Sequence, residues 1–210
     1  MADTLTIPQV VDALTAACDA IVAAKDRLTK ADQAIGDGDH GLGMSRGFTA
    51  GKEALAAATP DTVGDAFKEV GSAILATSGG ASGAIFGTWL RAPGKTVAGD
   101  TLDAEAYAVA LESGAEMVMK RGKATTGQKT MLDALVPAAE AARAAVGEGL
   151  PAAARAAAEA ASTGSEATKD MISGFGKSVT LGERSLGHPD PGSISVAIVL
   201  AAIADSIDAA

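Results

Sequence analysis

Apolar positions recur every three to four residues along most of the chain, a spacing typical of amphipathic helices. The first such segment follows Thr6-Ile7-Pro8-Gln9, which combines a capping threonine, a proline in the first turn and a glutamine three residues after the cap. We expect this helix to continue to about Lys30. Its inward positions are Val10, Val11, Leu14, Cys18, Ile21, Val22 and Leu28.

Seven further segments carry the helical pattern, and no stretch alternates as a half-buried strand would. Thr101 should cap the fifth helix, and Pro137 should bend the sixth. Short connections favour antiparallel neighbours, and no linker is long enough to separate two domains. We therefore expect one all-α domain, 1–210, of about eight helices. After the first, they cover about 42–58, 62–76, 84–90, 101–121, 131–146, 151–171 and 193–207.

Composition changes this picture in one respect. The 210 residues suffice for a buried core, and 48% of them are hydrophobic, but only 3% are aromatic. Alanine supplies much of the apolar surface, which favours helices that pack closely. We place Trp89 and Cys18 in the core.

Charge and cysteine usage restrict the partners and the compartment. A net charge of −9 argues against nucleic acid as a partner. Cys18 is the only cysteine, so no internal disulfide forms, which fits a reducing cytoplasm. The first residues do not resemble a signal peptide, and no charge-free run of about 18 apolar residues predicts a membrane span. We expect a cytoplasmic protein without a membrane partner.

Four polar or glycine-rich loops, 32–43, 77–83, 121–131 and 181–192, follow the first, third, fifth and seventh predicted helices. In an up-and-down antiparallel arrangement, all odd-numbered helices end on the same face of the bundle. The four loops should therefore gather at one end of the molecule. This regularity predicts a single composite site.

The first of these loops concentrates charge, with Asp32, Asp37 and Asp39 close to three glycines. Three converging carboxylates raise one another's pKa values, and a divalent cation relieves their repulsion. Oxygen ligands suit Mg²⁺, Mn²⁺ or Ca²⁺ rather than zinc. Taken alone, the segment is equally compatible with a polar turn, because Asp and Gly are common turn formers.

The second loop, 77–83, offers backbone N–H groups, small hydroxyls and a helix N-terminus, a combination that favours phosphate. The alternative is a tight helix connection that needs glycine for close packing. The loop lacks the Gly-Lys-Ser/Thr of a Walker A motif, and no strand precedes it as in a dinucleotide fingerprint. Acidic residues beside a phosphate loop indicate metal ions that bridge carboxylates and phosphates.

Several single residues leave alternatives open. His40 could donate to a phosphate oxygen, or it could orient the preceding carboxylate or cap the next helix. His188, in a proline-rich loop, suits a wall or lid over a ligand, or a rigid connector. Lys177 and Arg184 are nearby cations that could meet a phosphate or be solvated. Met131 could pack on an adenine ring or in the core.

Taken together, the loop motifs resemble the nucleotide-binding L subunit of dihydroxyacetone kinase (DhaL). The resemblance covers essentially the whole chain, in the right order. The motifs are Asp32…Gly36-Asp37-Gly38-Asp39-His40-Gly41, Gly79-Gly80-Ala81-Ser82-Gly83, Arg121-Gly122-Lys123…Gly127-Gln128-Lys129-Thr130-Met131 and Leu181-Gly182-Glu183-Arg184-Ser185…Gly187-His188…Asp190-Pro191-Gly192.

This resemblance implies an eight-helix antiparallel barrel with the nucleotide, ADP or ATP, at one end. In that family, three aspartates hold two Mg²⁺ ions that bridge the nucleotide phosphates. Carried over, the metal ligands are Asp32, Asp37 and Asp39. The nucleotide contacts would be His40, Gly41, Leu42, Gly43, Thr77, Ser78, Gly79, Gly80, Gly127, Met131, Lys177, Asp190, Pro191 and Gly192.

The chain departs from the family pattern at a few positions. Gly43 stands where asparagine is common, Thr77-Ser78 replaces other small residues, and Lys177 stands where arginine occurs. None of these differences removes a metal ligand. They bear only on the individual nucleotide contacts.

The resemblance also implies partners. The sugar would sit on a separate K subunit, and a phosphohistidine of an M subunit of the phosphotransferase system would recharge bound ADP. No residue of this chain would be phosphorylated. The alternatives are an ATP-dependent version with exchangeable ATP, a kinase for another acceptor, and a non-catalytic adapter that reports its nucleotide state to a transcriptional regulator.

Overall fold

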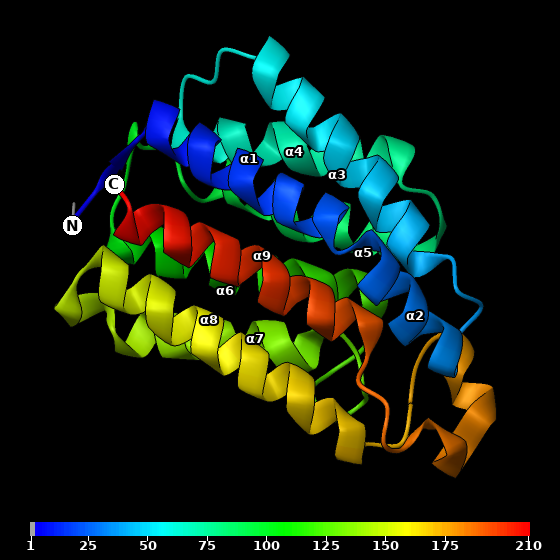
Figure 1. Cartoon of the computed structure of the whole chain (residues 1–210). Helices are drawn as coiled ribbons and strands as arrows, with labels where there is room; N and C mark the ends of the chain where they lie inside the picture. The colour runs from blue at the N-terminus through cyan, green and yellow to red at the C-terminus, as the bar shows by residue number, and fades with distance from the viewer. Residues whose placement is uncertain (1–2) are drawn as a thin grey trace.

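The computed structural model describes residues 3–210 of the chain and is almost entirely helical, which confirms the expected all-α class (Figure 1). Two short strands, β1 (Leu5–Thr6) and β2 (Thr101–Leu102), pair antiparallel. The α-helices of the described part are α1 (Ile7–Ala23), α2 (Lys25–Ile35), α3 (His40–Ala57), α4 (Val63–Thr77), α5 (Gly80–Arg91), α6 (Ala104–Gly122), α7 (Leu132–Ala144), α8 (Leu150–Ala167) and α9 (Pro191–Asp208). The 3₁₀ segments are η1 (Ala92–Lys95), η2 (Val146–Glu148), η3 (Thr168–Asp170) and η4 (Lys177–Ser185).

The first predicted helix is in fact two helices. It starts as expected, where the Thr6 backbone N–H donates to Gln9 Oε1 at 2.9 Å. It breaks at Ala24, and α1 and α2 are bent by 57° to each other. Neither glycine nor proline marks the break, so the sequence pattern contains no signal for it. The expected count of eight helices was therefore wrong, and Asp32 lies in the last turn of the separate helix α2.

Several helices also begin at other residues than predicted. Thr101 is not the cap of the fifth helix, because it pairs with Thr6 in the small sheet. Asp103 caps α6 instead, and its carboxylate accepts from the Ala106 N–H at 2.8 Å. Helix α5 begins at Gly80 rather than at Ala84, since glycine is tolerated in the first turn.

The segment after α8 differs most from the expectation. The seventh predicted helix was expected to reach about Met171, but α8 ends at Ala167 and gives way to η3. Part of the loop expected over 181–192 belongs to η4, and α9 starts at Pro191. Helix α7 continues through Pro137, which removes one backbone donor from its interior.

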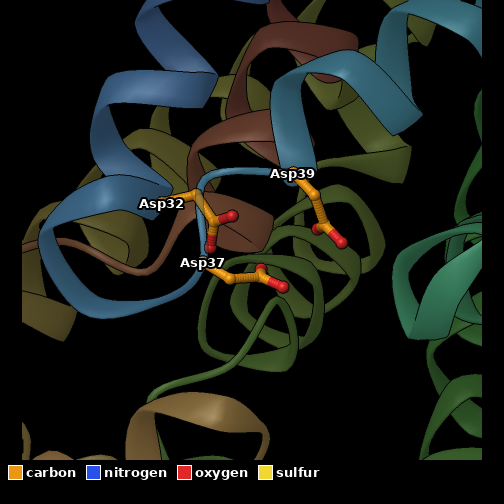
Figure 2. A group of neighbouring side chains, drawn as sticks. All are labelled: Asp32, Asp37 and Asp39. Atoms are coloured by element: carbon orange, nitrogen blue, oxygen red, sulfur yellow. The ribbon is translucent and has the colours of Figure 1, made fainter.

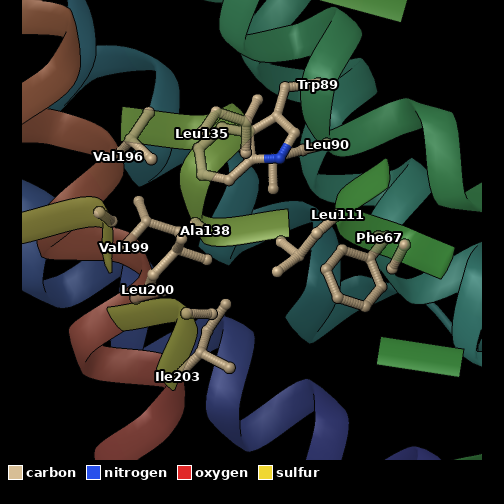
Figure 3. Packing of buried hydrophobic residues seen from close by; sticks show 14 of the residues in the cluster. Phe67, Trp89, Leu90, Leu111, Leu135, Ala138, Val196, Val199, Leu200 and Ile203 are labelled. Carbon is tan, nitrogen blue, oxygen red and sulfur yellow. The ribbon is translucent and has the colours of Figure 1, made fainter. Parts of the chain in front are cut away.

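The core draws on all nine α-helices of the described residues. Figure 3 shows Trp89 of α5 among side chains from α7 and α9. Its ring centroid lies 5.8 Å from that of Phe86, in an edge-on arrangement. Trp89 and Cys18 are 2% and 1% exposed, which confirms their predicted place in the core.

Helix α9 runs through the middle of the bundle, between α1 and α8 in Figure 1. By length and hydropathy it could cross a membrane, and so could the bent pair α1 and α2 if counted as one span. However, 56% of the α9 window is buried against the other helices. Its apolar character is that of a core helix.

Candidate metal and nucleotide site

A cavity of about 450 Å³ opens at one end of the bundle. All four loops singled out in the sequence contribute to its lining, which confirms that they gather at one end. The segment 175–178, ahead of the fourth loop, also reaches the cavity. The lining residues are Asp32, Ile35, Gly36, Asp37, Asp39, His40, Leu42, Gly43, Arg46, Ser78, Gly79, Gly80, Ala81, Ser82, Ile85, Phe86, Lys129, Thr130, Met131, Phe175, Gly176, Lys177, Ser178, Asp190, Pro191 and Gly192.

Three helices, α3, α5 and α9, begin at residues that line this cavity. Helix α7 begins directly after a lining residue. The first N–H groups of a helix lack partners within the helix and carry the positive end of its dipole. Four such ends at one cavity form an environment for an anion with several charged oxygens. The up-and-down topology produces this arrangement, because every second connection returns to the same end.

The three aspartates of the acidic loop converge on one point (Figure 2). One carboxylate oxygen of each lies within 4.8 Å of the others. Asp32 comes from the last turn of α2 and is 9% exposed, while Asp37 and Asp39 are exposed on the following turn. The His40 N–H donates to Asp32 Oδ2 at 3.1 Å, which fixes this carboxylate against the start of α3.

Gly36 allows the turn to pass close to Asp32. A Cβ atom at position 36 would lie 2.2 Å from Asp32 Oδ1, so no larger residue fits without displacing the carboxylate. The next glycine, Gly38, has a φ of +81°, which side-chain-bearing residues rarely adopt. The glycines of this segment therefore bring the three carboxylates together.

Lys177 of η4 reaches across to this cluster. Its ammonium contacts Asp37 and lies 3.5 Å from Asp39 Oδ2. The hydrogen bond from Lys177 lowers the pKa of the Asp37 carboxyl and raises that of the lysine. The sequence-based expectation of a raised pKa was therefore wrong for Asp37, because it did not include the lysine. The oxygen-only donor set fits a hard divalent cation.

The imidazole of His40 is buried, and both of its ring nitrogens bond serine hydroxyls rather than the Asp39 carboxylate. Its Nδ1 lies 3.0 Å from Ser82 Oγ and its Nε2 lies 2.9 Å from Ser195 Oγ. Burial lowers the pKa of His40. The ring thus joins the first turns of α3 and α5 to the second turn of α9, whereas a phosphate contact by the ring stays a prediction.

The glycines of the turn before α5 have two different roles: some allow the backbone conformation, and one allows close packing. Gly79 and Gly80 have φ values of +74° and +61°, and a Cβ at Gly80 would meet no atom within 4 Å. Gly80 therefore serves the backbone conformation rather than packing. Gly83 serves packing, because its Cβ would lie 2.6 Å from that of Ser78. Arg46 Nε donates to the Thr77 carbonyl at 2.7 Å, which ties α3 to the end of α4.

Three of the predicted nucleotide contacts do not line the cavity. A Cβ at Gly41 would lie 2.2 Å from Thr29 Oγ1, so this glycine allows α3 to approach α2. The Thr77 hydroxyl donates to the Ala73 carbonyl at 2.7 Å. The Gly127 N–H donates to the side chain of Asp133. Their predicted role as nucleotide contacts stays a prediction.

Part of the cavity lining was not predicted from the sequence. The missed apolar residues are Ile35, Ile85, Phe86 and Phe175, and Arg46 is a missed polar one. Ser82 and Lys129 belong to the loops expected at the site but were not predicted as individual contacts. Helical spacing could have revealed Ser82, Ile85 and Phe86, which lie three and four residues apart on α5. His188 and Arg184 are not among the lining residues.

At the start of α9, the Asp190 carboxylate accepts from the Ser193 N–H at 2.7 Å and so caps the helix. Burial raises the pKa of this carboxyl to about 7. Asp133 and Asp32 raise it further, while the Ser193 N–H and Lys129 lower it. The cavity therefore holds a carboxyl that titrates near neutrality, separate from the three aspartates.

The fold and the site define an all-α protein with an acidic cluster beside several helix N-termini. The sequence model of the DAK2 domain matches residues 34–205, and the chain belongs to this family. It is 39% identical over 204 residues to the PEP-dependent dihydroxyacetone kinase, ADP-binding subunit DhaL, of Escherichia coli, covering 96% of this chain and 97% of that protein. It is 38% identical to subunit DhaL of dihydroxyacetone kinase 1 from Listeria innocua, covering 82% of each chain.

Solved structures agree with this assignment. The crystal structure of the dihydroxyacetone kinase of C. freundii superposes with a TM-score of 0.74 at 25% identity, over 94% of this chain and 34% of that one. A second structure of that kinase, in complex with AMP-PNP and Mg²⁺, gives a TM-score of 0.71, also at 25% identity, over 94% of this chain and 33% of that one. This chain thus spans about a third of the length of that kinase.

Proposed function

We propose that this chain is the ADP-binding subunit of a dihydroxyacetone kinase and that it functions as one nucleotide-binding domain, 1–210. The observation that carries the proposal is the meeting of Asp32, Asp37 and Asp39 within 4.8 Å at a cavity where helix N-termini gather. The end-to-end similarity to the Escherichia coli subunit DhaL supports it. The relative is named for ADP binding and for a PEP-dependent kinase.

The three aspartates would hold two Mg²⁺ ions between the protein and the nucleotide phosphates. Two such ions carry +4, against three carboxylates and an ADP of about −3, which is a workable balance. The metal would neutralise charge on the phosphoryl group during transfer. The chain's own part is to hold Asp32 in place through the His40 N–H and to offer the first N–H groups of α3 and α5 to phosphate oxygens.

The apolar side of the cavity suits the base. Ile85, Phe86 and Met131 lie on its wall, and Phe175 faces it from the segment before η4. Aromatic and aliphatic surface of this kind buries a flat heterocycle well. The phosphates would then lie toward the acidic cluster and the base toward α5 and α7. Lys177, Pro191 and Gly192 would complete the nucleotide contacts.

We propose direct transfer of the terminal phosphoryl group to dihydroxyacetone held on a separate K subunit. Bound ADP would be recharged in place by a phosphohistidine of an M subunit of the phosphotransferase system. Positioning and electrostatic stabilisation supply most of the catalysis in such a transfer, and no side chain of this chain becomes phosphorylated. The compartment we propose is the cytoplasm, where the buried thiol of Cys18 would stay reduced.

Binding of ADP tests the site. With Mg²⁺ present, ADP at a thousandfold excess over its Kd should stabilise the wild-type chain by about 4 kcal/mol in thermal unfolding. Asp37→Ala should abolish the Mg²⁺-dependent part of this stabilisation. Asp61→Ala, an exposed aspartate before α4, is the matched control and should respond as wild type does. Wild-type-like stabilisation of the Asp37 variant would contradict the metal assignment.

Product formation tests the reaction. The chain, its K and M partners, phosphoenolpyruvate and dihydroxyacetone should together yield dihydroxyacetone phosphate, and omission of this chain should stop it. Product from ATP without the M subunit would favour the ATP-dependent alternative. No product with active partners would favour the adapter. The acceptor assay should include erythrulose, because the chain is 37% identical to part of an enzyme named L-erythrulose kinase from Pectobacterium atrosepticum.

A further inference from the structure

The segment 171–188, which we name the cap, follows η3 and precedes α9. It contains η4, and its residues Phe175 to Ser178 line the cavity. In Figure 1 the cap is the orange segment beyond the end of α2, set apart from the helical bundle. Its position makes it the part of the chain that would cover a bound nucleotide.

Apolar burial contributes little to holding the cap in place. Phe175 is partly buried and packs against the core, but three other large apolar side chains of the cap, Ile172, Val179 and Leu186, are 50%, 45% and 40% exposed. The buried residues of the cap are two serines, Ser173 and Ser185. A segment of this kind depends on hydrogen bonds for its conformation, because it gains little from the hydrophobic effect.

One buried ammonium joins the two ends of the cap. Lys129, from the loop before α7, is 1% exposed. Its Nζ donates to the Met171 carbonyl at 3.2 Å and to the His188 carbonyl at 2.6 Å. Its third proton goes to the Thr168 carbonyl at 2.5 Å, in η3. All three donors of the ammonium are therefore used, and each goes to the segment that contains or adjoins the cap.

Two backbone hydrogen bonds also hold the cap, one to the loop before α7 and one to η3. The Gly174 N–H donates to the Gln128 carbonyl at 3.0 Å, next to Lys129 in sequence. The Gly187 N–H donates to the Lys169 carbonyl at 2.8 Å, which closes the base of the cap a second time. Lys129 has a φ of +58°, an uncommon backbone conformation for a residue with a side chain. The backbone of Lys129 is thus strained at the position from which its side chain reaches the cap.

We infer that Lys129 is a positioning residue that clamps the cap over the nucleotide and thereby sets the affinity for it. The inference rests on the proposed nucleotide site. Lys129 acts by holding Phe175 and Lys177 in the cavity wall, and it does not act as a ligand of the metal. An ammonium suits this role, because charge-assisted hydrogen bonds to carbonyls are stronger than neutral ones.

Hydrogen exchange of the full chain without nucleotide tests the clamp itself. Lys129→Met keeps the length of the side chain and removes all three donors. Amides of 172–187 should exchange at least tenfold faster in this variant, while those of α1 and α4 keep their wild-type protection. Lys169→Met is the matched control, because Lys169 pairs with Glu166 at the surface beside the cap. Its cap should exchange as in wild type.

A second variant covers the case in which Lys129→Met does not fold. Lys129→Gln keeps two donors on a shorter side chain, so it cannot serve three carbonyls. Its cap should exchange faster than that of wild type. Wild-type exchange of the cap in either variant would overturn the inference. Loss of protection throughout the bundle in both variants would also overturn it, since the lysine would then support the whole fold.

Binding of ADP with Mg²⁺, measured by calorimetry, tests the link to function. Lys129→Met should weaken it at least tenfold and Lys169→Met less than twofold. Fast exchange of the cap with unchanged affinity would overturn the functional part of the inference. If the wild-type chain does not bind ADP at all, the proposed function fails, while the exchange experiment still decides on the clamp.

Discussion

His40 Nε2 lies 2.9 Å from Ser195 Oγ, so the first residue of α3 is joined to the second turn of α9 across 155 positions of sequence. The serine hydroxyl also lies 3.0 Å from the Pro191 carbonyl, to which it can only donate. Its oxygen then accepts from the imidazole. On the opposite side of the ring, Ser82 brings in α5. One side chain therefore holds three helix N-termini together at the cavity.

Removal of the Ser195 hydroxyl should weaken this junction. Ser195→Ala leaves Nε2 of a buried imidazole without a partner, and we expect a loss of about 1–3 kcal/mol in the free energy of unfolding. Ser206→Ala is the control, because the Ser206 hydroxyl of the same helix bonds only the Ala202 carbonyl. Urea unfolding measures both. Equal stability of the two variants would contradict a role of the His40–Ser195 contact.

Gly36 provides a test of the acidic cluster that leaves every carboxylate in place. Gly36→Ala puts a Cβ atom 2.2 Å from Asp32 Oδ1, so the Asp32 carboxylate must leave its present position in the cluster. We expect Mg²⁺-dependent binding of ADP to weaken by at least tenfold, as measured by calorimetry. Gly147→Ala is the matched control, since an added Cβ there meets no atom within 4 Å. Unchanged ADP affinity in the Gly36 variant would contradict the proposed place of Asp32 in the metal site.

Asp32 and Asp39 should differ in what they contribute to the unliganded protein. Asp32 is buried and accepts the His40 N–H, so Asp32→Ala leaves that donor unpaired and should cost about 1–3 kcal/mol of unfolding free energy. Asp39 is exposed, and Asp39→Ala should change stability by less than about 0.5 kcal/mol. Both should lose Mg²⁺-dependent ADP binding. Thermal unfolding with and without ligand separates the two effects, and equal losses of stability would contradict the difference in burial.

The sequence predicted which loops form the site better than the long-range contacts that hold these loops in place. The alternation of ordinary and unusual loops was enough to predict that Asp32, Ser78, Met131 and Asp190 lie at one cavity. The reason is that an antiparallel bundle returns every second connection to the same end. The local motif GDGDHG identified the acidic turn, since glycine indicates a turn of the backbone and aspartate indicates negative charge.

Contacts between residues far apart in the sequence could not be predicted from local patterns. The break at Ala24 carries no glycine or proline, so the local sequence pattern does not indicate it. A lysine such as Lys129 is expected at the surface, and only the distant carbonyls of Met171 and His188 explain its burial. Lys177 likewise meets Asp37 across 140 positions, so sequence spacing could not predict that the pKa of Asp37 falls.

Asp190 should make stability depend on pH near neutrality. Its folded-state pKa of about 7 lies above the ordinary value of about 3.9, so between these values the folded chain binds the proton and the unfolded chain releases it. The unfolding free energy should therefore rise as pH falls from 8 toward 5. Although the carboxyl group is buried where it caps α9, the residue as a whole keeps some exposure at the cavity, so we expect a gain of about 1–2 kcal/mol rather than the full value for such a shift. Asp190→Asn keeps an oxygen to cap α9 and removes the titrating proton. This variant should be more stable than wild type at pH 8 and lose most of the difference in stability between pH 8 and pH 5. Urea unfolding at both pH values measures this, and an unchanged pH profile in the variant would assign the effect to another group.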